Sequence, residues 1–406
     1  MNNLLSNFKI KAMLMLGIIL IFVISLTIVA CIPKSLVENN VISSLKFLDD
    51  NESREWHNSF TYETGSILDD YTDSIMISYV NTQDKATNNP LEDALDACGY
   101  TRYWHGYMMF LKPLLVFFTY AQIRYIFMYL YLVLMAWACV EIYKRIGIKG
   151  TMAYAISFAA IYFPVLSFSL QFSYIFFIAL VATIFICKKY NSEMSTSKIA
   201  TWFLVIGMIT NFLDLLTAPL ITLGIPLALI ILINIVEAKE AQAITNYKIL
   251  VKTSFAWGMG YGICWISKWI IASIVLKRNI MEDALAQAFF RINGDNEIPL
   301  DRLQMYRDNF NAIFPTWFWS SNRRILLVII ALIAMTVMYL IKKKPLSEIK
   351  RLSPLIILSI YPYIWYFVMA NHSQIHFFFT YRIQMITVFS LLSVFLFSLK
   401  DKKVFL

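Results

Sequence analysis

Four acidic side chains lie within eleven positions of a polar segment that follows the first apolar stretch of the chain. Residues 62–73 (YETGSILDDYTD) contain Glu63, Asp69, Asp70 and Asp73. On a helix, Asp69 and Asp73 would share one face at i,i+4, whereas Asp70 would point about 100° away. Such crowding favours proton uptake by one carboxylate, which suits a general base acting on a hydroxyl group. We therefore interpret Asp69, Asp70 and Asp73 as candidate catalytic residues, although a solvated acidic loop or a helix N-terminus would show the same pattern.

Basic residues that could hold an anion recur in two other polar segments. Arg102 and His105 lie in residues 102–107 (RYWHGY), where a cation could hold a phosphate while the rings stack on a sugar. His372, His376 and Arg382 lie in the last polar segment and suit the binding of a phosphate or pyrophosphate. An aromatic belt with anchoring arginines at a membrane surface is the alternative for both segments.

Two charged residues lie in or beside apolar stretches. Lys268 lies inside one of them, and an ionisable residue at membrane depth indicates function, although its side chain could instead extend to the interface. Asp214 lies at a turn between two apolar stretches, where it could pair with Lys268 or Arg382 or cap a helix. We include both among the candidate substrate-binding residues.

The sequence does not predict a metal centre. His372 and His376 at i,i+4 could share a helical face and bind zinc, but no glutamate completes an HExxH motif. The five cysteines form no CxxC pair. We expect no cofactor; a divalent cation is compatible with the carboxylates but is not indicated.

The composition indicates an integral membrane protein. Apolar residues make up 59% of the chain and charged residues 15%, against about one half and one quarter in soluble domains. We expect one all-α polytopic domain over residues 1–406 with about ten transmembrane helices. Apolar stretches long enough to cross a core of about 30 Å lie near residues 12–32, 123–143, 151–167, 172–187, 200–216, 219–236, 254–276, 324–341, 353–370 and 383–399.

The distribution of charge predicts the orientation of these helices. With the N-terminus inside, the cytoplasmic segments hold 19 of the 35 Lys and Arg residues but only 6 of the 26 acids. This asymmetry predicts a plasma-membrane protein with both termini in the cytoplasm. The basic residues lie in short clusters between apolar stretches, so the net charge of +9 does not indicate nucleic-acid binding.

The predicted outer face carries the segments that could perform chemistry. Two long segments, 33–122 and 277–323, and a short loop at 371–382 fall on that side together with all four histidines. An apolar run at 106–120 and the helical spacing behind Asp301 predict interfacial helices in the two long segments. We therefore expect an extracytoplasmic site.

This arrangement resembles the GT-C superfamily of glycosyltransferases that use polyprenyl-phosphate sugars. The resemblance covers the whole chain as architecture, but at the level of motifs it is confined to Asp69, Asp70 and the nearby acids. It implies that Asp69 or Asp70 is the base, supported by Asp73 or Glu63. It also implies that basic groups bind the lipid phosphate, here Arg102, His105, Lys268, His372, His376 and Arg382.

The resemblance implies an inverting displacement at the anomeric carbon. The partners would be a polyprenyl-phosphate-linked sugar, a glycan or lipid-linked acceptor, and membrane lipids. The pair is Asp-Asp where some members have Asp-Glu, which leaves the identity of the base open. No soluble domain follows the last apolar stretch, which favours a small or lipid-linked acceptor.

Other membrane functions remain as alternatives. A flippase or transporter of lipid-linked glycan would favour inverted repeats and charges near the midplane, where only Lys268 lies. A polymerase or ligase of lipid-linked glycans is chemically close to the predicted transferase. A multispan acyltransferase fits less well, because its donor would be expected inside, where the loops are short and simply basic.

Overall fold

The computed structural model describes residues 2–50, 67–81, 89–96, 99–237, 243–314, 321–342, 345 and 349–400. Glu63 and His57 lie outside these residues. The described part folds into helices without a β-sheet, which confirms the predicted all-α class. Six segments are long and apolar enough to cross a membrane, so the chain has the character of a multi-pass membrane protein. They are Lys9–Ala30, Tyr120–Ala159, Leu170–Lys189, Thr196–Leu213, Ile244–Leu276 and Phe377–Ser398.

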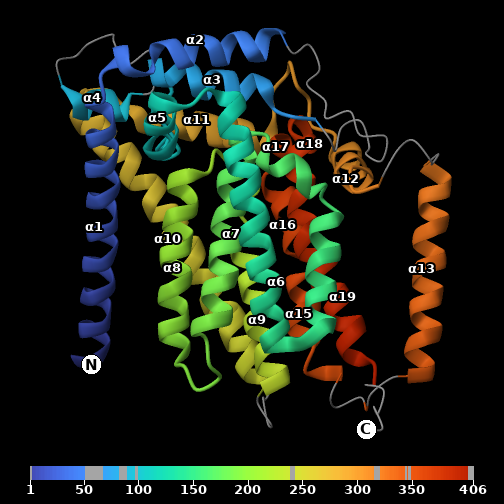
Figure 1. Ribbon diagram of the computed structural model, residues 1–406. Helices are drawn as coiled ribbons and strands as arrows, with labels where there is room; N and C mark the ends of the chain where they lie inside the picture. Colours follow the sequence, from blue (N-terminus) through green and yellow to red (C-terminus); the bar gives the residue numbers. More distant parts are fainter. Residues whose placement is uncertain are drawn as a thin grey trace.

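Ten helices, most of them long, form an upright bundle in the described part of the chain, with α1 and α13 standing at its two sides (Figure 1). They comprise α1 (Asn2–Ala30), α6 (Tyr120–Ala159), α7 (Leu170–Lys189), α8 (Thr196–Leu213), α9 (Ile221–Glu237), α10 (Ala243–Leu276), α13 (Ser321–Lys342), α15 (Ser353–Leu358), α16 (Tyr361–Val368) and α19 (Met385–Ser398). Helices α8 and α10 pack closely at Gly207 of α8 and Gly260 of α10. A Cβ on Gly207 would lie 2.3 Å from the Trp257 carbonyl oxygen, so only glycine allows this approach.

Helix α6 reverses direction within its length. Gly147 has φ 69° and ψ −169°, values that interrupt the helix. Past this break, Lys149 Nζ donates to the Leu399 carbonyl at one end of the bundle, while Tyr162 contacts the Ile313 carbonyl at the other. The two halves of α6 therefore run in opposite directions.

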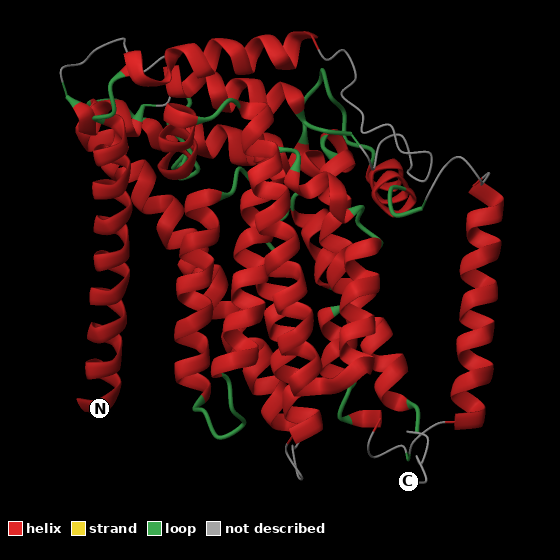
Figure 2. Cartoon of the chain, viewed as in Figure 1, coloured by secondary structure: helices red, strands yellow, loops and turns green. Residues whose placement is uncertain are grey.

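A layer of shorter helices covers the end of the bundle opposite the start of α1 and the end of α19, as Figures 1 and 2 show. We call it the cap layer. It consists of α2 (Lys34–Asp50), α3 (Asp70–Asn81), α4 (Pro90–Leu95), α5 (Met108–Phe117), α11 (Ile280–Asn293) and α12 (Arg302–Asn311). Helix α2 buries Val37, Val41 and Leu48 on one face, as an amphipathic helix lying on a bundle should. Helices α5 and α12 occupy the two predicted interfacial segments.

The last polar segment connects this layer to the bundle. It contains α17 (Ala370–Ile375), α18 (Phe377–Thr380) and a 3-10 turn, η4 (Tyr381–Gln384). Asn371 Nδ2 donates to the Phe290 carbonyl of α11 at 2.9 Å, and Asn309 of α12 donates to the Ser373 carbonyl at 2.9 Å. Helix α17 is thus fixed against both α11 and α12.

Candidate functional site

Asp69 is a buried carboxylate at the start of α3. Its Oδ1 accepts a hydrogen bond from the Thr72 backbone N–H at 3.0 Å, and its Oδ2 accepts one from the Thr72 hydroxyl at 2.9 Å. These bonds make Asp69 the N-cap of α3, because the capping oxygen meets the N–H three residues ahead. These two bonds hold the Asp69 side chain against the first turn of α3.

Arg382 lies within electrostatic reach of Asp69. The guanidinium is fully buried and is attracted by the Asp69 carboxylate. Its Cζ lies 4.3 Å from the centre of the Phe172 ring, and its Nη1 donates to the Phe378 carbonyl at 2.9 Å. A carboxylate and a guanidinium from segments more than 300 residues apart therefore lie near each other beneath the cap layer.

Asp73 has a different environment from Asp69. Its Oδ1 accepts from the Ser169 hydroxyl and the Gln171 N–H, both at 3.1 Å. Its Oδ2 accepts from the Leu170 N–H at 2.9 Å and from the Tyr120 hydroxyl. Burial raises the pKa of the Asp73 carboxyl to about 7, and the hydrogen bond from Tyr120 opposes that rise. Asp73 thus caps the N-terminus of α7 from outside that helix.

Asp70 forms a buried ion pair with Arg124 of α6. The Asp70 Oδ1 to Arg124 Nη2 distance is 2.5 Å, and both side chains are about nine-tenths buried. The Arg124 guanidinium also lies 4.4 Å from the centre of the Tyr120 ring. Asp70 and Asp73 therefore fix α3 to α6 and α7, whereas Asp69 is the acid of the three that acts electrostatically on Arg382.

Arg291, His372 and His376 form a second polar cluster where α11 meets α17. Arg291 Nη1 lies 2.8 Å from His372 Nδ1 and 2.8 Å from His376 Nε2. Burial lowers the pKa of His376 to about 3, and the charge of Arg291 lowers it further. Burial also lowers the pKa of His372 well below its ordinary value. Both imidazoles are therefore neutral.

Stacked rings connect this cluster to Arg382. The His376 ring stacks on Phe379 with centroids 5.0 Å apart, and Phe379 contacts Phe172 at 6.0 Å. Phe172 is the ring beneath Arg382. The predicted residues His372, His376 and Arg382 are thus brought to one place.

Asp214 shapes the turn between α8 and α9. Its two carboxylate oxygens accept from the Thr217 N–H at 3.0 and 3.2 Å. Between these residues, Leu216 adopts φ 71°, a strained value for a leucine, and its carbonyl lies 2.8 Å from His372 Nε2. Burial raises the pKa of the Asp214 carboxyl to about 7, against the lowering effect of the Thr217 hydrogen bond. Asp214 therefore affects the cluster of Arg291, His372 and His376 indirectly, because it stabilises the turn that directs the Leu216 carbonyl toward His372.

The other predicted binding residues contact the cap layer away from these clusters. Lys268 is fully buried, and its Nζ donates to the Leu95 carbonyl at the C-terminus of α4, 2.8 Å away. Arg102 pairs with Asp283 of α11 at 3.1 Å. His105 Nε2 lies 2.8 Å from the Tyr100 carbonyl, and burial lowers its pKa to about 3. These contacts hold the cap layer together.

Two arginines of these clusters were not predicted from the sequence. Arg124 begins the second apolar stretch and Arg291 ends α11, and neither belongs to a motif. The only available signal was a cation at the predicted outer boundary of a membrane span or in an outer loop, which many other residues share. Within the described residues, no group of three or more His, Cys, Asp or Glu side chains could hold a metal ion.

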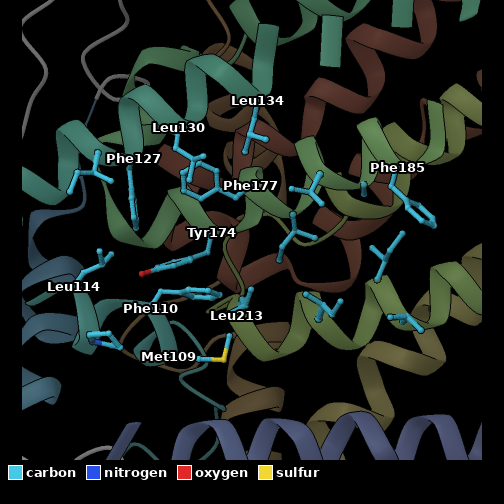
Figure 3. A pocket seen from close by; sticks show the side chains of 18 of the residues that line it. Met109, Phe110, Leu114, Phe127, Leu130, Leu134, Tyr174, Phe177, Phe185 and Leu213 are labelled. Carbon is cyan, nitrogen blue, oxygen red and sulfur yellow. The ribbon is translucent and has the colours of Figure 1, made fainter. Parts of the chain in front are cut away.

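An apolar groove of about 970 Å³ runs along α6, α7 and α8 and ends against α5 of the cap layer (Figure 3). Phe110, Phe127, Phe177 and Leu213 are among its lining residues. Tyr174 also lines it, and in the described part of the chain its buried hydroxyl has no hydrogen-bond partner. Tyr174 lies one turn beyond the end of α7 that Asp73 caps.

Comparison with known proteins found no matching family model, no matching curated protein and no matching solved structure.

Proposed function

We propose that this chain is a membrane glycosyltransferase that moves a sugar from a polyprenyl-phosphate carrier to a hydroxyl group of a cell-surface glycan or lipid-linked acceptor. The observation that carries this proposal is the buried carboxylate Asp69 within electrostatic reach of the buried guanidinium Arg382. Asp70 pairs with Arg124, and Asp73 accepts from three donors at the N-terminus of α7 and from the Tyr120 hydroxyl of α6. Asp69 is the aspartate of the three that acts on Arg382, and it is therefore the proposed base.

The reaction is a single displacement. Asp69 takes the proton of the acceptor hydroxyl while that oxygen attacks the anomeric carbon. The bond from this carbon to the phosphate oxygen breaks, and the electron pair leaves with the lipid phosphate. Arg382 stabilises the negative charge that gathers on the leaving group. Attack opposite the leaving group inverts the anomeric centre, and this leaving group needs no separate acid.

The proposed topology has ten membrane passes. Four passes are added to the six candidate spans: the returning half of α6, then α9, α13, and α15 with α16. Both termini would lie in the cytoplasm of a plasma-membrane protein, with the cap layer and Asp69 outside. The asymmetry of 19 basic against 6 acidic residues in the cytoplasmic segments supports this orientation.

The apolar groove supports a lipid-borne substrate. Its lining is almost entirely hydrocarbon, and it lies on the side of the bundle that a bilayer would surround. An isoprenoid chain could lie there with its phosphate directed toward the cap layer. A soluble nucleotide sugar has no hydrocarbon chain that would bind to such a surface.

The test is a cell-envelope glycan analysis. A strain lacking this protein is complemented with the wild type, with Asp69→Asn or with Asp283→Asn as a cap-layer control, and glycan masses are compared. We expect one sugar mass to be lost in the deletion strain and with Asp69→Asn, and to return with the wild type and Asp283→Asn. Normal glycans with a well-folded Asp69→Asn protein would exclude Asp69 as the base. A flippase would instead lose transport of a complete lipid-linked glycan while the bond-forming step persisted.

A further inference from the structure

Arg291 presents an unusual set of contacts for a half-buried cation. Its Nη1 carries two hydrogens and lies 2.8 Å from a ring nitrogen of each histidine, His372 and His376. Both hydrogens can be donated only if each ring nitrogen keeps its lone pair, so both imidazoles must be neutral. The partners of this guanidinium nitrogen thus carry no charge.

The tautomer of His372 is fixed from the opposite side. Its Nε2 lies 2.8 Å from the Leu216 carbonyl, which can only accept, so Nε2 carries the proton and Nδ1 the lone pair. The left-handed backbone of Leu216 aims that carbonyl, and Asp214 stabilises the turn through the Thr217 N–H. The turn between α8 and α9 therefore orients the imidazole that orients Arg291.

The other edge of the guanidinium makes no such contact. Among the described residues, neither Nε nor Nη2 of Arg291 has a hydrogen-bond partner, and no Asp or Glu oxygen lies within 4.0 Å. These two nitrogens form the planar fork that binds two oxygens of one anion. Arg145 of this chain uses the same edge, with Nε 2.6 Å and Nη2 2.8 Å from the two oxygens of Glu237.

We propose that the Nε and Nη2 edge of Arg291 binds the phosphate group of the lipid-linked substrate, with His372 and His376 as positioning residues. This inference rests on the proposed function for the identity of the lipid carrier. Ring contacts from His376 through Phe379 and Phe172 connect the new phosphate contact to Arg382 of the proposed reaction centre. The donor phosphate is a diester with one negative charge, and it becomes a monoester dianion when the sugar leaves, so Arg291 adds a second cation to Arg382 as that charge develops.

The test is a direct binding measurement on the purified full-length protein. Farnesyl phosphate and inorganic phosphate are titrated separately, and binding is followed as a shift in thermal unfolding. The variants are Arg291→Ala and Arg291→Gln, the second of which retains an N–H donor toward the imidazoles. Arg278→Ala is the matched control, because it removes a cap-layer cation already paired with Asp96 at 2.6 Å.

We expect the dissociation constant for farnesyl phosphate to rise about tenfold or more in both Arg291 variants and to stay unchanged in Arg278→Ala. If inorganic phosphate binds more weakly than farnesyl phosphate but loses affinity in the same Arg291 variants, the phosphate is the group that Arg291 recognises. Unchanged farnesyl phosphate binding by Arg291→Gln would overturn the inference. If the wild type binds through Arg291 but transfers no sugar, the site stands and the transferase proposal fails.

Discussion

Replacing Asp73 with asparagine separates the structural acid of α3 from the proposed base. Each oxygen of Asp73 accepts from one hydroxyl and one backbone N–H: Ser169 and Gln171 on Oδ1, Tyr120 and Leu170 on Oδ2. An asparagine has only one such oxygen. Whichever way its amide is placed, an NH₂ group faces one backbone N–H of α7. The hydroxyl that faces this NH₂ group, of Ser169 or Tyr120, can rotate and accept a hydrogen bond from it. The backbone N–H can only donate, so it is left without an acceptor.

The magnitude follows from this count. One buried backbone N–H without an acceptor costs about 1–3 kcal/mol, and loss of the charge-assisted capping bonds adds about 1 kcal/mol. We therefore expect Asp73→Asn to lower the free energy of unfolding by about 2–4 kcal/mol. Asp69→Asn keeps one oxygen that can accept from Thr72 and should cost less, about 1 kcal/mol.

The assay is unfolding in detergent followed by a thiol-reactive dye. Cys187 and Cys264 are buried in α7 and α10 and become reactive when the bundle opens. Titration with a denaturing detergent then gives the difference in stability between each variant and the wild type. If Asp73→Asn were as stable as Asp69→Asn, Asp73 would not be the cap of α7, and the assignment of roles among the three aspartates would be wrong.

Three further results are expected. His376 has a folded-state pKa of about 3 against about 6.5 when unfolded, so between these values the unfolded chain binds more protons and stability falls as the pH drops. Detergent titrations at about pH 7.5 and about pH 5 should therefore show a smaller loss of stability for His376→Gln than for the wild type. Equal losses would contradict the neutral imidazole beside Arg291. Arg124→Leu should cost about 3–5 kcal/mol by leaving Asp70 buried without its partner, and Asp70→Asn in the same chain should recover part of that loss; failure to recover any would show that the pair is not coupled. Val181→Trp, which narrows the groove from its exposed edge, should raise the apparent Michaelis constant for a long-chain donor more than for a short-chain one, and equal effects would remove the groove from the substrate path.

Local sequence patterns predicted the helices well, because the length of an apolar stretch and the residues that interrupt it are local properties of the sequence. The stretch predicted at 172–187 corresponds to α7, Leu170–Lys189, and that at 200–216 largely to α8, Thr196–Leu213. The predicted break between the second and third stretches corresponds to the turn at Gly147. The predicted stretch at 151–167 ends as a helix at Ala159, and a 3-10 turn, Phe163–Ser167, follows it at Pro164.

The roles of the acids could not be predicted locally, because their partners lie far along the chain. Asp73 meets Tyr120 and Leu170, which are 47 and 97 residues away. Asp70 meets Arg124, 54 residues away. Spacing alone places these carboxylates on a helix, but only tertiary packing shows which of them form ion pairs or hydrogen bonds with distant residues.

The same limit applies to the basic residues. Lys268 was expected at membrane depth, and it is buried, but its partner is the Leu95 carbonyl of the cap layer. Arg291 gains its importance only when α17 is packed against α11 through Asn371. A lone arginine in an outer loop carries no signal of that contact.

The most direct measurement is the rate at which purified protein releases polyprenyl phosphate from the lipid-linked sugar pool extracted from cells, in the presence of extracted acceptor glycan. Wild type and Asp69→Asn are compared at equal amounts of folded protein. Removal of a general base typically costs about 10²–10⁴-fold in rate, so Asp69→Asn should retain at most about 1% of the wild-type rate with little change in donor affinity. An Asp69→Asn protein that transfers sugar at the wild-type rate would contradict the account.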